Sequence, residues 1–99
     1  MDSKSTTNVA IVETSVVILN KVGLHARPAR LLVQTAALFQ ARIQIYYGDK
    51  TANAKSIVSV LKLGAAFGDT LVLHAEGEDA QQAIETLTDL VYRKFDEEE

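Results

Sequence analysis

The chain of 99 residues has no cysteine, no tryptophan and a single proline. Without cysteine it can form neither a disulfide nor a thiolate metal site, which is typical of a reducing compartment. No apolar run approaches the roughly 20 residues that a membrane helix needs. Residues 1–8 are polar and lack the basic segment and long apolar region of a secretory signal. We therefore expect a cytoplasmic protein that does not cross a membrane.

The chain also lacks an excess of positive charge, since its formal net charge is −3. Nucleic-acid-binding domains normally present a dominant basic face, so we expect no direct contact with nucleic acid. Acidic residues gather at 76–79 and 96–99. Basic residues gather near two predicted helix starts: Lys21, Arg27, Arg30, Lys55 and Lys62. We expect this small basic surface to meet an acidic protein partner.

The length and the mean hydropathy of +0.06 predict one globular domain with a modest core. Glu13 and Thr14 interrupt an apolar run, so we place the first strand from Ser15 to Asn20. This divides the chain into a flexible N-terminal extension (1–13), a folded domain (14–95) and a solvated acidic tail (96–99).

Hydrophobic periodicity and turn residues predict the remaining elements. They are a helix from Arg27 to about Phe39, strands at 42–47 and 50–54 joined by a Gly48–Asp49 turn, a short helix between Ser56 and Gly64, a strand at 70–75, and a helix from Asp79 or Ala80 to about Phe95. Ser56 and Asp79 are suitable N-caps. The prominent hairpin favours an α+β fold, with a four-stranded antiparallel sheet covered on one face by three helices.

The stretch from Asn20 to Arg30 carries the clearest functional signal. Gly23 permits a sharp turn after the strand, and Pro28 suits the first turn of a helix. His25 is thereby placed at the helix N-terminus, where free amides and the helix dipole favour an anion. We interpret His25 as a nucleophile that becomes a phosphohistidine.

Two kinds of donor are available to hold a phosphoryl group on His25. Because proline has no N–H, the free amides belong mainly to Ala26, Arg27 and Ala29. The Arg27 guanidinium adds a forked and permanently charged contact. A polar histidine that merely lies near a helix cap is the alternative interpretation.

Other catalytic patterns are missing from the chain. It has no Walker glycine loop, no Gly-x-Ser-x-Gly and no Gly-x-Gly-x-x-Gly, so nucleotide binding lacks support. His74 has no carboxylates at a spacing that favours a metal site. We expect no cofactor, and an enzyme with its own small-molecule substrate is the least favoured class.

Ser56 has two compatible interpretations. As an N-cap its side chain satisfies helix amides, which stabilises a helix by about 1 kcal/mol. If Ser56 is phosphorylated, the new charge lies where the helix dipole favours it. The charge would also lie beside Ile57, Val58 and Leu61 and would weaken docking of an acidic, apolar partner there. Ser56 is therefore a candidate switch on binding.

Three segments carry a resemblance to a known family: Gly23–Ala29 (GLHARPA), Ala54–Ile57 (AKSI) and Ala75–Asp79 (AEGED). From about Thr14 to Tyr92 the chain resembles HPr, the histidine-containing phosphocarrier of the phosphoenolpyruvate-dependent sugar phosphotransferase system. The resemblance implies an open-faced β-sandwich with four antiparallel strands and three helices. It also implies a stoichiometric phosphocarrier and not an enzyme, and we expect a monomer.

By the same resemblance, His25 would take a phosphoryl group on Nδ1 from phosphorylated enzyme I and pass it to the IIA domains of sugar permeases. Arg27 would orient and stabilise that group. Ser56 matches the serine that an ATP-dependent HPr kinase/phosphorylase modifies in carbon catabolite repression, and the product acts with a catabolite-control transcription factor.

The resemblance also implies a partner-docking patch. Ile57, Val58 and Leu61 match apolar positions of that patch, although several relatives carry methionine at the last two. Arg30 is larger and more basic than the small residue often found at its position. Two alternatives stay open: a related carrier of the nitrogen-regulatory branch, or a mainly regulatory adaptor that acts through phosphorylated Ser56.

Overall fold

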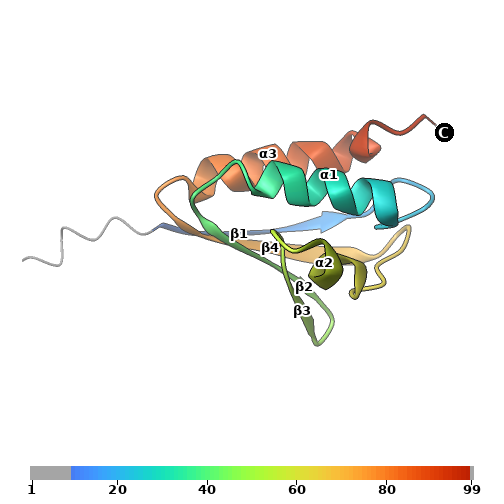
Figure 1. Ribbon diagram of the computed structural model, residues 1–99, viewed down its shortest axis with the longest axis horizontal. Helices are drawn as coiled ribbons and strands as arrows, with labels where there is room; N and C mark the ends of the chain where they lie inside the picture. The colour runs from blue at the N-terminus through green and yellow to red at the C-terminus, as the bar shows by residue number, and fades with distance from the viewer. Residues whose placement is uncertain (1–9, 99) are drawn as a thin grey trace, which may run out of the picture.

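The computed structural model describes residues 10–98, in which four strands form one sheet (Figure 1). The strands are β1 (Ala10–Val17), β2 (Arg42–Tyr47), β3 (Lys50–Asn53) and β4 (Thr70–Gly77). Their spatial order is β1-β4-β2-β3, and every neighbouring pair is antiparallel. The helices α1 (Ala26–Ala36), α2 (Ile57–Leu61) and α3 (Ala80–Tyr92) lie on one face of this sheet, as Figure 1 shows. The predicted α+β open-faced sandwich is confirmed.

The core lies between the sheet and the helices because successive strand side chains point to opposite faces. Leu71, Leu73 and Ala75 of β4 are fully buried, and the residues between them lie on the uncovered face. The apolar stripe predicted for α3 is buried at every position: Ala80, Ala83, Ile84, Leu87, Leu90 and Val91. In the part of the chain that the structure describes, no helix has the length and apolar character needed to cross a bilayer.

The prediction that the first strand begins at Ser15 is wrong, because β1 begins at Ala10 and ends at Val17. Ala10 pairs with Gly77, so residues 10–13 belong to the sheet and not to a flexible extension. Glu13 does not interrupt the strand, because its side chain faces outward and contacts His74 on β4. The predicted flexibility of 1–9 concerns residues outside the described part of the chain.

The prediction of a frayed, solvated acidic tail (96–99) is wrong for Glu97, whose side chain is only 19% exposed. α3 ends at Tyr92, and Lys94, Phe95 and Asp96 then adopt left-handed backbone angles, with φ of 58°, 54° and 59°. The turn buries Phe95 completely in the core. After this turn Glu97 packs against Asn20 and Arg27, whereas Asp96 and Glu98 are exposed.

Asp79 does not cap α3 as predicted, because its side chain makes no capping hydrogen bond among the described residues. Its two carboxylate oxygens instead accept the backbone N–H groups of Gln40 and Ala41, each at 2.8 Å. These amides lie just before β2, where no helix or strand satisfies them. Asp79 therefore ties the start of α3 to the connection between α1 and β2.

Candidate functional site

The loop between β1 and α1 is fixed against residues 65 and 66. The Leu24 N–H donates to the carbonyl oxygen of Ala65 at 3.0 Å, and the Leu24 side chain is buried. Gly23 has φ +71°, and a Cβ on it would lie 2.8 Å from both the Ala65 oxygen and the Ala66 Cα. Only glycine fits this close approach. Gly23 therefore allows the contact with residues 65 and 66 that positions the loop and, with it, His25.

His25 is the N-cap residue of α1, and its side chain is exposed. Its carbonyl accepts the Ala29 N–H at 2.9 Å, which is the first hydrogen bond of the helix. The Ala29 amide is thus engaged, and its predicted availability to a phosphoryl group is wrong. The amides of Ala26 and Arg27 precede this first bond. Among residues 10–98 the imidazole makes no capping hydrogen bond, so the ring is available for chemistry.

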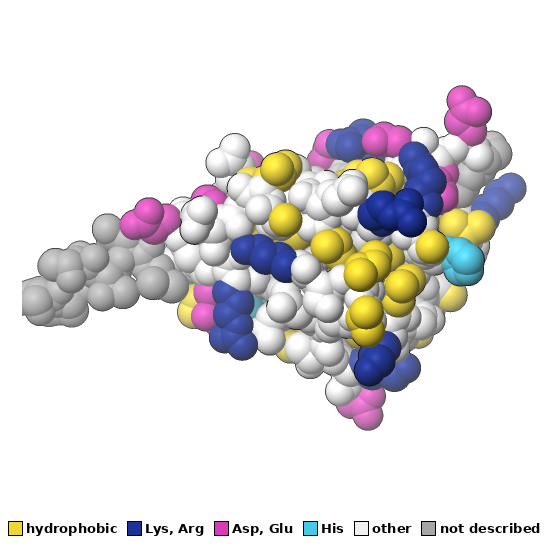
Figure 2. All heavy atoms as spheres, in the orientation of Figure 1, with side chains coloured by type: hydrophobic (Ala, Val, Ile, Leu, Met, Phe, Trp, Pro, Cys, Tyr) yellow, Lys and Arg dark blue, Asp and Glu magenta, His cyan; other side chains and the backbone are white. Residues whose placement is uncertain are grey.

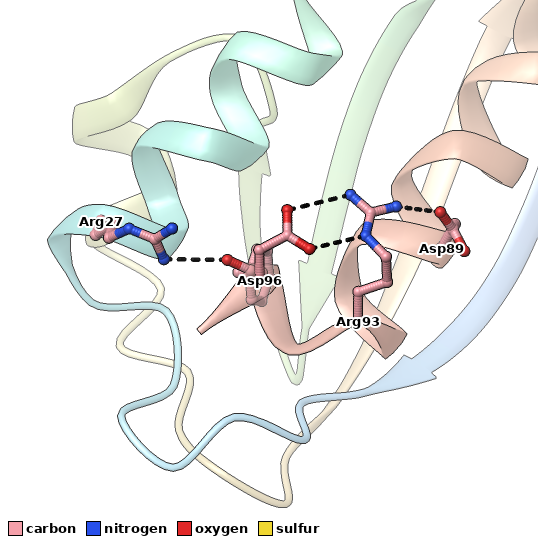
Figure 3. A network of polar contacts seen from close by, with 5 residues as sticks. Arg27, Asp89, Arg93 and Asp96 are labelled. Carbon is pink, nitrogen blue, oxygen red and sulfur yellow. Dashed lines mark hydrogen bonds and ion pairs between the residues drawn. The ribbon is translucent and has the colours of Figure 1, made fainter. Parts of the chain in front are cut away.

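Arg27 contacts the C-terminal segment (94–98), a contact that the sequence analysis missed (Figure 3). Its Nη1 donates to the carbonyl oxygen of Phe95 at 3.0 Å and lies 3.7 Å from Oε2 of Glu97. The Arg27 side chain is 52% exposed, so the guanidinium keeps a solvent-facing side. The role of Arg27 toward a phosphoryl group on His25 stays a prediction. The sequence holds one sign that the C-terminal segment contacts the rest of the protein: the aromatic residue Phe95 stands among charged residues at 93–99.

Asn20 is a second residue that the sequence analysis missed. It is completely buried, and its Nδ2 donates to the Gly23 carbonyl at 2.8 Å and to Oε1 of Glu97 at 3.1 Å. Asn20 therefore joins the loop before His25 to the C-terminal segment. Nothing in its local sequence distinguishes it from an ordinary turn residue.

The docking patch predicted on α2 lies at the surface. Ile57, Val58 and Leu61 are 37%, 59% and 41% exposed. Leu61 and His25 line one open hollow of about 480 Å³ together with residues 64–66. Figure 2 shows exposed hydrophobic side chains gathered near a histidine, with Lys and Arg side chains around them. Arg30 is exposed on α1.

Ser56 is the N-cap of α2, as predicted, and its Oγ accepts the Ser59 N–H at 3.2 Å. Ser59 in turn accepts the backbone N–H of Asn53 through its own Oγ at 2.9 Å. The start of α2 is thus tied to the end of β3. Ser56 is half-buried, with its hydroxyl engaged in the cap.

His74 lies on the uncovered face of the sheet and forms a separate polar cluster. Its Nδ1 is 2.6 Å from Glu13 and its Nε2 is 2.9 Å from Glu76. Hydrogen bonds to Glu76 and then to Glu13 raise the pKa of His74 above its usual 6.5. The edge of the Tyr46 ring meets the imidazole, with centroids 5.9 Å apart. Across residues 10–98, no group of three or more His, Cys, Asp or Glu side chains is placed to hold a metal.

The fold and this site define a class of protein: an open-faced α+β sandwich that presents an exposed histidine at the start of its first helix. The family model described as "PTS HPr component phosphorylation site" matches residues 12–93. The chain therefore belongs to the HPr family, the phosphocarriers of the phosphotransferase system.

Comparisons with individual proteins agree with this assignment. The chain is 44% identical over 85 residues to phosphocarrier protein NPr of Shewanella violacea, a match that covers 86% of this chain and 93% of that protein. It is similar to the crystal structure of an HPr from Thermoanaerobacter tengcongensis, with a TM-score of 0.86, 46% identity and coverage of 89% and 99% of the two chains. For HPr of Bacillus anthracis the TM-score is 0.80, the identity 43% and the coverage 83% and 98%.

Proposed function

We propose that this protein carries a phosphoryl group on His25, which it takes from phosphorylated enzyme I and passes to an acceptor domain of the IIA type. The observation that carries the proposal is the exposed imidazole at the N-cap of α1 in a chain of the HPr family. A ring nitrogen forms a bond to phosphorus, and the bond from phosphorus to the donor breaks with its electron pair going to the donor. The protein is left modified until the next transfer, so it acts as a stoichiometric carrier.

The start of α1 stabilises the phosphoryl group in this proposal. The free amides of Ala26 and Arg27 donate to its oxygens, and the helix dipole contributes about 0.3–1 kcal/mol for an anion at a helix start. The Arg27 guanidinium supplies further donors from its solvent-facing side. Such moderate stabilisation suits a carrier, because a group that is held too tightly could not be passed on.

The docking patch (Ile57, Val58 and Leu61) places partners against His25. Its apolar side chains are exposed beside the hollow that His25 and Leu61 line, so a partner seated there covers the imidazole. Arg30 and the other basic side chains near the helix starts favour an acidic partner surface. The partner then completes the active site around the phosphorus atom.

Ser56 acts as a regulatory phosphorylation site in this proposal. A phosphate on its Oγ would keep oxygen acceptors at the N-cap of α2, so the fold tolerates the modification. The added charge would lie next to Ile57 and would repel an acidic partner. A kinase of the HPr kinase/phosphorylase type and a catabolite-control transcription factor are the corresponding partners.

The nitrogen-regulatory branch is a second candidate for the pathway that this carrier serves. The 44% identity to a protein named NPr favours it, whereas similar identities to proteins named HPr favour the sugar branch. Phosphorylation rates with enzyme I of each branch, measured side by side, distinguish the two. The branch whose enzyme I gives the higher kcat/KM is the one served.

The carrier function is tested by incubation with labelled phosphoenolpyruvate and enzyme I. We expect wild type and the control His74→Gln to take up acid-labile label, and His25→Ala to take up none. Label that is acid-stable, or that persists in His25→Ala, contradicts the proposal.

The regulatory role of Ser56 is tested by incubation with ATP and the kinase. These should label wild type but not Ser56→Ala, and equal labelling of both rejects Ser56 as the site.

A further inference from the structure

Strand β1 forms one edge of the sheet, and among residues 10–98 it pairs with β4 only. Ile18, just after β1, shows which residues face β4. Its N–H donates to the Asp69 carbonyl at 2.9 Å, and its carbonyl accepts the Gly68 N–H at 2.8 Å. Hydrogen bonding alternates from residue to residue in an antiparallel pair, so every second residue back from Ile18 bonds β4. The residues between them direct their N–H and C=O groups away from the sheet: Ile11, Glu13, Ser15 and Val17.

This edge lacks several of the features with which proteins protect an exposed strand. β1 is eight residues long, contains no lysine or proline, and keeps an unbroken register with β4 from Ala10 to Val17. The other edge strand, β3, has only four residues, and the N–H of Asn53 at its end donates to Ser59 Oγ. β1 can therefore accept one more strand, whereas β3 offers much less.

A groove of about 520 Å³ lies between β1 and α3, which packs along this strand (Figure 1). Its lining combines apolar side chains with three carboxylates: Val12, Ile84, Tyr92, Glu13, Glu85 and Asp89. The groove shares no residue with the hollow that His25 lines. It is therefore a separate surface beside the open edge of the sheet.

We propose that the open edge of β1 and this groove bind an extended, basic segment of a partner protein, which joins the sheet as a further antiparallel strand. Main-chain hydrogen bonds to the outward groups of β1 hold the segment, as in other cases of strand addition. Alternate side chains of a strand point to opposite faces. Apolar side chains of the segment thus enter the groove, and basic side chains on its other face lie beside Glu13. The segment leaves His25 uncovered, so the inference goes beyond the proposed function and does not depend on it.

The carboxylates decide which partner fits. Glu85 accepts a hydrogen bond from neutral Gln81 at 2.8 Å, so this contact does not neutralise its charge. Asp89 shares the guanidinium of Arg93 with Asp96. A second copy of this chain, paired edge to edge, would bring the same carboxylates toward these and repel them. Charge complementarity therefore favours a basic segment over a second copy.

The probe for this site is a blocked seven-residue peptide of alternating lysine and valine, added to the ¹⁵N-labelled full-length protein. In an antiparallel pair, residues directly opposite one another exchange hydrogen bonds and have their side chains on the same face. The lysines of the peptide therefore supply the N–H groups that bond β1, and the valines direct theirs away from it. N-methylation of the lysines should abolish binding, whereas N-methylation of the valines, the matched control, should preserve it.

We expect NMR titration to show saturable binding with a Kd below about 1 mM. Hydrogen exchange should become slower at the outward amides of β1. Glu85→Gln should weaken binding about 1.5- to fivefold, the range that corresponds to exposed ion pairs. Asp49→Asn, which removes a charge from the hairpin between β2 and β3, should not change it. A peptide with glutamate in place of lysine should not bind.

Four results would overturn the inference: no binding of the lysine–valine peptide, equal binding of the two N-methylated peptides, equal binding of the glutamate peptide, or slowed exchange at α2 in place of β1. Sedimentation of the free protein tests the remaining occupant. A dimer that the peptide dissociates would assign the edge to a second copy and would also overturn it. A monomer that binds the lysine–valine peptide through β1 supports it.

Discussion

Oδ1 of Asp79 accepts the backbone N–H of Ala41 at 2.8 Å, across 38 positions of the chain. The same two loops also meet at Gly77, where a Cβ would lie 2.8 Å from the Ala41 Cα. The end of β4 and the start of β2 are therefore in close contact at the edge of the core. This contact fixes α3 relative to the sheet on which α1 and its histidine rest.

Asp79→Asn should lower the thermal midpoint of unfolding, because it replaces one of the two acceptor oxygens with an NH₂ group, which cannot accept a backbone N–H. The backbone hydrogen bond from Gln40, followed by that from Ala41, lowers the pKa of Asp79 below its usual 3.8. Its contribution is therefore present above pH 3.8 and is lost as pH falls through the lower folded-state pKa. Thermal melts between pH 2 and 7 should show a smaller pH dependence in Asp79→Asn than in wild type. Glu78→Gln is the control, and an equal effect there contradicts the assignment.

His74→Gln should change the pH dependence of stability above pH 6.5. The pKa of His74 is raised by Glu76 and Glu13, so its stabilising charge is fully present below pH 6.5 and is lost as pH rises through the folded-state pKa. Urea unfolding at several pH values between 6 and 9 should show a steeper fall of stability in wild type than in His74→Gln. Identical slopes would show that the carboxylates do not stabilise the imidazolium.

Gly23→Ala should destabilise the protein more than Gly48→Ala does. Both glycines have positive φ, of +71° and +60°, so both substitutions meet a backbone cost of about 1–2 kcal/mol. Only at Gly23 would the Cβ also strike backbone atoms of residues 65 and 66 at 2.8 Å, whereas nothing lies within 4 Å at Gly48. We expect a loss above about 2 kcal/mol for Gly23→Ala by urea unfolding, together with slower labelling of His25. Equal losses at the two positions would mean that the contact with 65 and 66 relaxes freely.

Ser56→Ala and Ser56→Asp should separate the capping role of this residue from its regulatory role. Ser56→Ala removes the acceptor for the Ser59 N–H and should cost about 1 kcal/mol of stability. Ser56→Asp keeps an acceptor and should retain most of that stability, but its charge should weaken binding to enzyme I. Urea unfolding and calorimetric titration measure the two effects. Unchanged affinity in Ser56→Asp would argue against a switch that acts by charge.

Much of the candidate site could be anticipated from the sequence because its determinants are local. The order of glycine, histidine, arginine and proline between 23 and 28 requires a turn and then a helix, and the structure has both. Ser56 likewise caps α2 as its own chemistry dictates. The start of β1 could not be anticipated, because in the sequence Glu13 looks like a break in an apolar run. Only the tertiary structure shows that Glu13 lies opposite His74 on β4 and contacts it.

The sequence by itself determined the α+β class, the apolar stripe of α3 and the exposed position of His25 at a helix start. These features depend on periodicity and on the backbone preferences of glycine, proline and serine, which act within a few residues. Tertiary structure alone decided that the acidic end packs against Arg27 and that Asp79 binds the α1–β2 connection in place of its own helix. Those contacts join residues far apart in the chain, so the core must form before either carboxylate meets its partner.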